Sequence, residues 1–162
     1  MARKVFFSFH FERDIWRTGQ VRNCWITKPD RESAGYWDKV KWEQVQKEGD
    51  EAIKRWINNS LDGTSVTVVL IGAETSTRRW VTYEISQSHN RGNGMFGIYI
   101  HNIKNSLGQT DTRGKNPFET LHFTRNGQLI YLSQLYPTYD WVNEGGYENL
   151  GKWVEQAALK VK

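Results

Sequence analysis

Residues 64–71 have the sequence Thr-Ser-Val-Thr-Val-Val-Leu-Ile, the strongest β-strand signal in the chain. An apolar run without polar alternation is typical of a central parallel strand that is covered on both faces. Residues 4–9 and 95–101 predict two further buried strands. Apolar residues spaced three and four apart predict helices over residues 42–61 and 78–89. This alternation predicts an α/β fold with a mainly parallel sheet and helices on both faces.

The remaining segments give weaker signals. Residues 11–25 favour a helix without a clean apolar stripe, and residues 26–37 are mainly loop, where any second strand would be short. Nearer the C-terminus, residues 128–132 favour a strand and residues 141–159 a closing helical region. The order of these last elements does not follow from the pattern alone.

The chain has 162 residues, a length that suits one domain with a sizeable core. No internal repeat, low-complexity tract or linker divides it. We therefore predict a single domain over residues 1–162, with a core of about residues 1–118 and a less regular extension over residues 119–162.

Composition argues against several classes of protein. The net charge of +4 is spread along the chain, and no basic run resembles a nucleic-acid-binding arm. One cysteine excludes an intramolecular disulfide and a Cys-rich zinc site, and the four histidines lack zinc-like spacing, so we expect no metal and no bound cofactor. The N-terminal apolar stretch is too short for a signal peptide or membrane span, which predicts a cytoplasmic protein without membrane contact.

Parallel α/β sheets bind ligands at the carboxyl ends of their strands, where the strand order reverses. In a flavodoxin-like order, Ser8, Phe9 and His10 would form one lip of that crevice and residues 72–75 the other. The chain has no Gly-x-Gly-x-x-Gly loop, P-loop or Gly-x-Ser-x-Gly elbow. Dinucleotide binding of the Rossmann type, P-loop chemistry and esterase chemistry are therefore disfavoured.

Trp80 and Glu84 give the sharpest sign of chemistry. They lie four residues apart and share one face of the predicted helix over residues 78–89. A carboxylate beside a large aromatic ring is uncommon on a buried face unless it is paired or faces a cleft. Spacing alone leaves equally open an exposed Glu84 that pairs with Arg79 or Arg91.

Several short pieces together resemble the TIR-like family of bacterial Thoeris anti-phage defence. The resemblance extends over nearly the whole chain to about Phe118. Its strongest pieces cover residues 5–9, 64–72, 79–85 and 97–101, and shorter ones cover residues 21–23, 42–43, 114–118 and 139–142. The Trp-x-x-x-Glu-Ile element of residues 80–85 is similar to the segment in which TIR domains present their catalytic glutamate.

The resemblance implies a flavodoxin-like fold and an enzyme that cleaves NAD between nicotinamide and ribose, with NAD as substrate. It further implies conversion of ADP-ribose into a cyclic nucleotide that activates a downstream anti-phage effector. Glu84 would be the catalytic carboxylate. The substrate would contact Phe6, Ser8, Phe9, Asn23, Trp37, Arg78 and Trp80. A homo-oligomer and a trigger supplied by phage infection are compatible with the same resemblance.

Two other functions remain open on the sequence. A non-catalytic TIR module would use the aromatic residues as an interface for protein–protein association. A receptor for a nucleotide signal would keep the pocket without turning over NAD. Loss of nicotinamide release in a Glu84→Gln variant would separate the enzyme from both.

Overall fold

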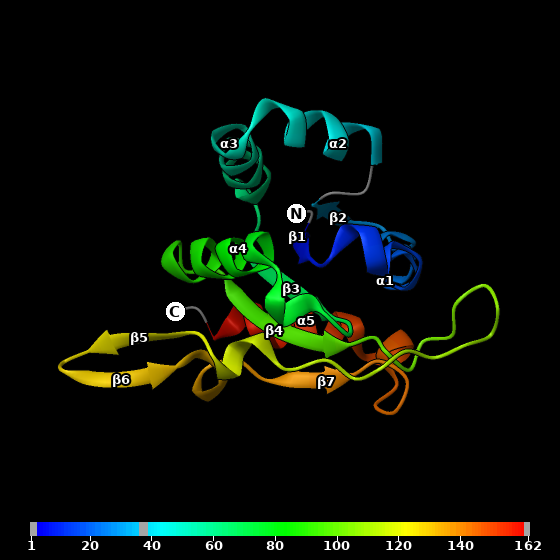
Figure 1. The fold of residues 1–162 in the computed structure, drawn as a ribbon. Helices are drawn as coiled ribbons and strands as arrows, with labels where there is room; N and C mark the ends of the chain where they lie inside the picture. Colours follow the sequence, from blue (N-terminus) through cyan, green and yellow to red (C-terminus); the bar gives the residue numbers. More distant parts are fainter. Residues whose placement is uncertain (1–2, 36–38, 161–162) are drawn as a thin grey trace.

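A five-stranded parallel sheet forms the centre of the computed structural model, which describes residues 3–35 and 39–160 (Figure 1). Its strands run in the spatial order β2-β1-β3-β4-β7, and every neighbouring pair is parallel. The strands are β1 (Arg3–Ser8), β2 (Arg31–Ala34), β3 (Val66–Ile71), β4 (Gly94–Tyr99) and β7 (Thr138–Asp140). The predicted α/β, flavodoxin-like fold is confirmed.

Strand β3 occupies the middle of the sheet, as its composition predicts. All six of its residues are buried, and it pairs with β1 on one side and β4 on the other. Val66 is aligned with Val5 of β1 and with Gly94 of β4. A continuous apolar run suits this position because both faces of the strand are covered.

Helices cover both faces of the sheet. The helices are α1 (Phe11–Ile26), α2 (Lys39–Glu48), α3 (Asp50–Leu61), α4 (Arg79–Asn90) and α5 (Gly146–Leu159). Val68 and Phe96 pack in one apolar cluster with Trp153 of α5, whereas Val69 packs with Ile85 of α4 in a second cluster. Alternate residues of the central strands therefore face different helices, because successive side chains point to opposite faces.

The single helix predicted over residues 42–61 is instead two helices, α2 and α3. Gly49 separates them with a φ of 100°, a conformation that residues with a Cβ rarely adopt. The three- and four-residue spacing continues across this break, which is why the pattern alone suggested one helix. Asp62 and Gly63 end α3 as predicted, and Gly63 has a φ of 80°.

The segment after Phe118 contributes a hairpin, a sheet strand and a helix. Strands β5 (His122–Arg125) and β6 (Gln128–Tyr131) form an antiparallel hairpin that projects away from the sheet (Figure 1). The predicted strand over residues 128–132 is thus β6, outside the main sheet, whereas the edge strand β7 was not expected. Short 3-10 turns are η1 (Thr75–Thr77), η2 (Pro117–Glu119) and η3 (Leu132–Gln134). Within residues 3–35 and 39–160, no helix is long and apolar enough to cross a membrane.

Candidate active site

A cleft of about 390 Å³ opens at the carboxyl ends of β1 and β3. The chain leaves β1 toward β2 on one side and returns to β3 on the other, so this is the point where the strand order reverses. The lining residues come from the end of β1, the starts of α1 and α4, and helix α2: Phe9, His10, Phe11, Glu12, Trp42, Gln46, Thr77, Arg78, Arg79, Trp80, Val81 and Glu84. The volume lies within the range of small-molecule sites.

Glu84 is the buried acid of this cleft. Its side chain belongs to α4, and the residue is only 3% exposed. Ser8, the last residue of β1, donates a hydrogen bond of 2.6 Å from Oγ to Oε1 of Glu84. Burial raises the pKa of Glu84 to about 8, although the Ser8 hydrogen bond acts in the opposite direction. The carboxyl group of Glu84 therefore holds a proton at neutral pH.

The pattern of α4 explains why Glu84 is buried. Val81 and Ile85 pack against the sheet, and Ser88 hydrogen-bonds Thr67 of β3 at 2.7 Å. Glu84 shares this sheet-facing side, since residues three and four apart stack along a helix. It meets Ser8 because β1 ends there, and the register places Ser8 beside Val69 of β3, on the face that α4 covers.

Trp80 lies half-buried one turn before Glu84. Its ring contacts Tyr83 edge-on at 5.8 Å between centroids, and the Arg79 guanidinium lies 4.4 Å from the ring centre. Arg79 also pairs with Asp50 of α3 at 2.9 Å. These contacts hold the indole at the wall of the cleft, where a flat ligand ring could stack on it.

His10 and Glu12 form another part of the cleft wall; the place of His10 after a strand end was predicted, whereas the part of Glu12 was not. His10 Nε2 lies 3.3 Å from Glu12 Oε2, and Trp42 Nε1 donates to Glu12 Oε1 at 3.0 Å. Burial, followed by the charge of Arg78, lowers the pKa of His10. Its Nδ1 is buried without a hydrogen-bond partner in the part of the chain that the structure describes.

The loop after β3 is fixed by ion pairs. Glu74 pairs with Arg78, which lines the cleft, and with Arg13 of α1. Arg13 also donates to Asp111 at 2.9 Å. Thr75 Oγ1 accepts a 2.8 Å hydrogen bond from the backbone of Gly72. The rim that carries Arg78 is therefore tied to α1 and to the segment after β4.

The predicted site residues fall into three groups. Glu84, Phe9, Arg78 and Trp80 line the cleft, and Ser8 reaches it through its hydrogen bond to Glu84. Two of the expected residues do not line it.

Phe6 is fully buried two residues before Ser8, so it supports the cleft from below without lining it. Asn23 lies exposed on α1, about three helical turns beyond Phe11, because α1 runs away from the cleft. Trp37 lies outside the described residues. Of the shorter pieces quoted for the family resemblance, residues 21–23 therefore lie away from the cleft, with Val21 buried in the core and Asn23 exposed.

Comparison with known proteins agrees with this architecture. The family described as Thoeris protein ThsB, TIR-like domain, matches residues 6–105. These residues include the end of β1, all of β3 and α4, and the whole lining of the cleft. A relative from Bacillus cereus (strain MSX-D12), named putative cyclic ADP-D-ribose synthase ThsB1, is 37% identical over 191 aligned residues, which cover 95% of this chain and 100% of the relative. The chain therefore belongs to the ThsB family of Thoeris TIR-like proteins.

Proposed function

We propose that the Glu84 cleft cleaves the bond between nicotinamide and ribose in NAD and closes the ADP-ribose part into a cyclic nucleotide. The name of the Bacillus cereus relative supports the reaction class. The observation that carries the assignment to a site is the carboxyl group of Glu84, 3% exposed in a cleft where the strand order reverses. Buried acids with a raised pKa in a cleft are typical of functional sites.

The first step breaks the glycosidic bond. Nicotinamide leaves as a neutral molecule with the bonding electron pair, and the ribosyl carbon becomes an oxocarbenium-like cation. The carboxylate of Glu84 stabilises this positive charge. An internal hydroxyl group of the ADP-ribose part then forms the new bond to that carbon, and Glu84 accepts the hydroxyl proton.

This role needs Glu84 in its ionised form. The pKa of about 8 that burial gives Glu84 favours the protonated form. The nicotinamide ring of bound NAD carries a positive charge, and a nearby opposite charge favours the carboxylate. The Ser8 hydroxyl stabilises the same ionised form through its 2.6 Å hydrogen bond. Substrate binding would thus prepare the acid for the reaction.

The walls of the cleft suit the rest of the substrate. Phe9 and Trp80 offer aromatic surfaces to the flat rings, and Arg78 and Arg79 offer positive charge to the diphosphate. Exclusion of water favours ring closure, because water competes with the internal nucleophile for the cation.

The wider setting belongs to the same proposal. We propose that the reaction uses no metal and no cofactor besides its substrate, and that it takes place in the cytoplasm. The cyclic product would act on a separate effector. A phage-derived trigger and association with a second copy of the chain would control turnover.

The test is a Glu84→Gln variant, assayed for nicotinamide release and for cyclic product by mass spectrometry. We expect NAD binding to persist and both products to fall by about 10² to 10³-fold, the usual cost of removing one preorganised electrostatic group. Glu51→Gln is the matched control, since Glu51 is exposed on α3 and its ion pair among the described residues is with Lys54 of the same helix.

Two outcomes would reject the proposal. Wild-type protein that releases no nicotinamide, even with lysate of phage-infected cells, would favour a non-catalytic module if partner binding survives Glu84→Gln. Wild-type protein that binds a cyclic nucleotide without consuming NAD would favour the receptor.

A further inference from the structure

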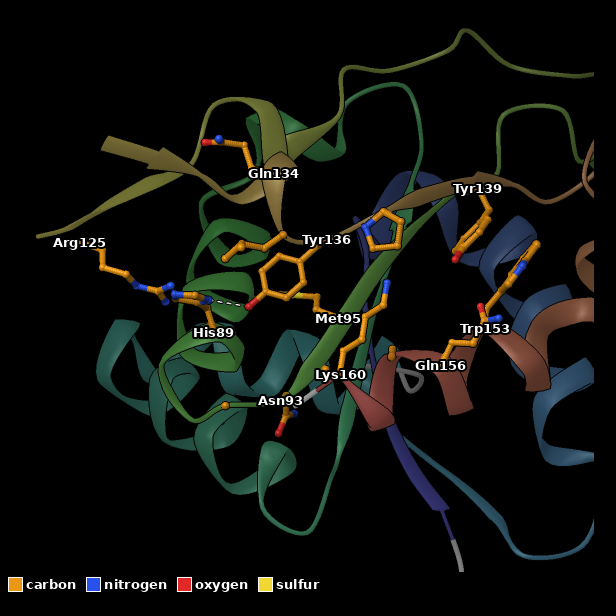
Figure 2. A pocket seen from close by; sticks show the side chains of 15 residues that line it. His89, Asn93, Met95, Arg125, Gln134, Tyr136, Tyr139, Trp153, Gln156 and Lys160 are labelled. Atoms are coloured by element: carbon orange, nitrogen blue, oxygen red, sulfur yellow. Dashed lines mark hydrogen bonds between the residues drawn. The ribbon is translucent and has the colours of Figure 1, made fainter. Parts of the chain in front are cut away.

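A second cavity, of about 540 Å³, lies at the other end of the sheet. It is formed by the last turn of α4, the start of β4, the segment that leads into β7 and the last turns of α5 (Figure 2). It shares no lining residue with the Glu84 cleft. The cavity therefore belongs to the amino ends of the strands, away from the proposed chemistry.

The charged side chains that line this cavity are basic. Arg125, Lys160 and His89 line it, and no Asp or Glu residue does. Among residues 3–35 and 39–160, neither Arg125 nor Lys160 has an acidic partner within ion-pair distance. Burial lowers the pKa of His89, and the charge of Arg125 lowers it further. Arg125 therefore contributes a positive potential to the cavity, and no acid among the described residues forms an ion pair with it.

The rest of the wall is aromatic and held in place. Tyr139 stacks on Trp153, with ring centroids 4.2 Å apart and planes at 8°. Tyr136 Oη and His89 Nδ1 share a hydrogen bond of 2.6 Å. Figure 2 shows Arg125 beside His89 at one end, Tyr139 and Trp153 at the other, and Lys160 extending between them. A ligand would meet positive charge and aromatic surface in the same cavity.

Amide side chains complete the lining. Asn93 is 7% exposed, and its Nδ2 is held by Thr64 Oγ1 at 3.0 Å and Thr67 Oγ1 at 3.3 Å. Gln134 and Gln156 also line the cavity, and Gln134 Oε1 accepts a 2.8 Å hydrogen bond from the backbone N–H of Tyr131. Such groups can hydrogen-bond a polar ligand without adding negative charge.

We propose that this cavity is a second ligand site, which takes a small phosphorylated molecule. Arg and Lys side chains without acidic partners bind phosphate groups through charge-assisted hydrogen bonds. The volume fits a small molecule, and the few fixed polar groups in an apolar wall are typical of such sites. The inference is independent of NAD cleavage, because it uses none of the residues of the Glu84 cleft.

The test is an NMR titration of the 162-residue chain with AMP, inorganic phosphate and uncharged adenosine. We expect AMP to shift the backbone amides of Gly92, Gly94 and Gln156 in a saturable way. Adenosine should bind there at least about tenfold more weakly, because it lacks the anion. Phosphate binding equal to that of AMP would identify the phosphate as the recognised part, whereas tighter AMP binding would show that the organic part also contributes.

The decisive variant is Arg125→Gln with Lys160→Gln, which removes both unpartnered charges. We expect the AMP affinity at this end to fall at least about tenfold. Arg55→Gln with Lys152→Gln is the matched control, because both residues are exposed cations on α3 and α5 and neither lines the cavity. Any AMP shift at Trp80, in the other cleft, should be the same in all three proteins.

Three results would overturn the proposal. The first is the absence of saturable shifts at Gly92 and Gly94 with both AMP and phosphate. The second is equal AMP affinity in wild type and in the Arg125→Gln, Lys160→Gln variant. The third is adenosine binding as tight as that of AMP.

Discussion

The two ends of the sheet carry different titratable groups. At the carboxyl ends, Glu84 is buried beside Ser8, and its pKa is raised to about 8. At the amino ends, Arg125 and Lys160 line a cavity without acids, and the pKa of His89 is lowered. In both places burial shifts the titrating group toward its neutral form. The carboxyl end therefore has a buried acid that is already in place, whereas the amino end has basic side chains that we propose to bind an anion.

The largest expected effect is on how stability depends on pH. Glu84 has an ordinary pKa of 4.5 and a folded-state pKa of about 8, so the folded protein holds a proton that the unfolded chain releases. This stabilisation is complete below pH 4.5 and is lost as pH rises to about 8, up to about 5 kcal/mol in the free energy of unfolding at about 1.4 kcal/mol per unit. Glu84→Gln should remove this loss, measured by urea unfolding across that range.

His89 provides the contrast from the other end of the sheet. Its folded-state pKa lies below the ordinary value of 6.5, so it contributes stability above pH 6.5 that is lost as pH falls through the folded value. His89→Gln should therefore remove a loss of stability as pH falls below 6.5, whereas Glu84→Gln removes a loss of stability as pH rises from 4.5 to about 8. Asp14, whose pKa is raised to about 6, has the sign of Glu84 but a narrower window. A constant stability difference between wild type and Glu84→Gln across pH would contradict the buried acid.

The next expected effect is on enzymatic activity, which should change with substitutions at the carboxyl end and not with substitutions at the amino end. Because the ionised form of Glu84 does the chemistry, kcat/KM for NAD should rise with pH toward about 8, by about a hundredfold over the two units below. The kcat profile should be flatter, since bound substrate lowers the pKa. Arg125→Gln with Lys160→Gln should leave both profiles unchanged. A kcat/KM that is flat between about pH 6 and pH 8 would exclude Glu84 as the titrating base.

How much the sequence reveals also differs between the two ends. The carboxyl end is built from β1, β3 and α4, whose apolar patterns predicted their positions to within two residues. The spacing of Glu84 to Trp80 left its exposure open, and the family resemblance singled it out as the acid. Ser8 and Phe9 followed from their place at a strand end. His10 followed in the same way, whereas Glu12 was missed because a polar residue after a strand looks like any loop residue until the helix that follows is placed.

The amino end was not foreseen at all. Its walls come from segments far apart in the chain, among them Arg125 of the hairpin, Tyr136 and Lys160. Strand β7 is three residues long and joins the edge of the sheet through tertiary contacts that no local pattern encodes. The exposed position of Asn23 has a similar cause, because only the direction of α1 decides which of its turns faces the cleft.

A smaller expected effect, on the free energy of unfolding, comes from close packing at the carboxyl end. A Cβ on Gly72 would lie 2.2 Å from Oδ2 of Asp14, which is 1% exposed. Gly72→Ala should therefore lower the free energy of unfolding by about 1–3 kcal/mol. At the amino end, Gly92 has a φ of 82° and open space around it, so Gly92→Asn should cost little, since Asn tolerates this conformation. Thermal or urea unfolding measures both.

A double variant shows whether the Gly72 effect comes from this contact. Asp14→Ala removes the carboxyl group that the new methyl would meet, so Gly72→Ala should cost less in that background than in wild type. Additive costs would mean that the loop after β3 is sensitive for another reason.

The smallest effect concerns the hydroxyl of Ser8, which is the one hydrogen-bond partner that lowers the pKa of Glu84. Ser8→Ala should raise the midpoint of the kcat/KM profile by about one unit, since one hydrogen bond to a charged group is worth about 1.5 kcal/mol at the low end. Thr67→Val removes a buried hydroxyl nearer the amino end, where it bonds Ser88 at 2.7 Å. That variant should lose stability while its midpoint stays in place. A shift of the midpoint in Thr67→Val as large as in Ser8→Ala would mean that the acid responds to the packing of α4 and not to its own hydrogen bond.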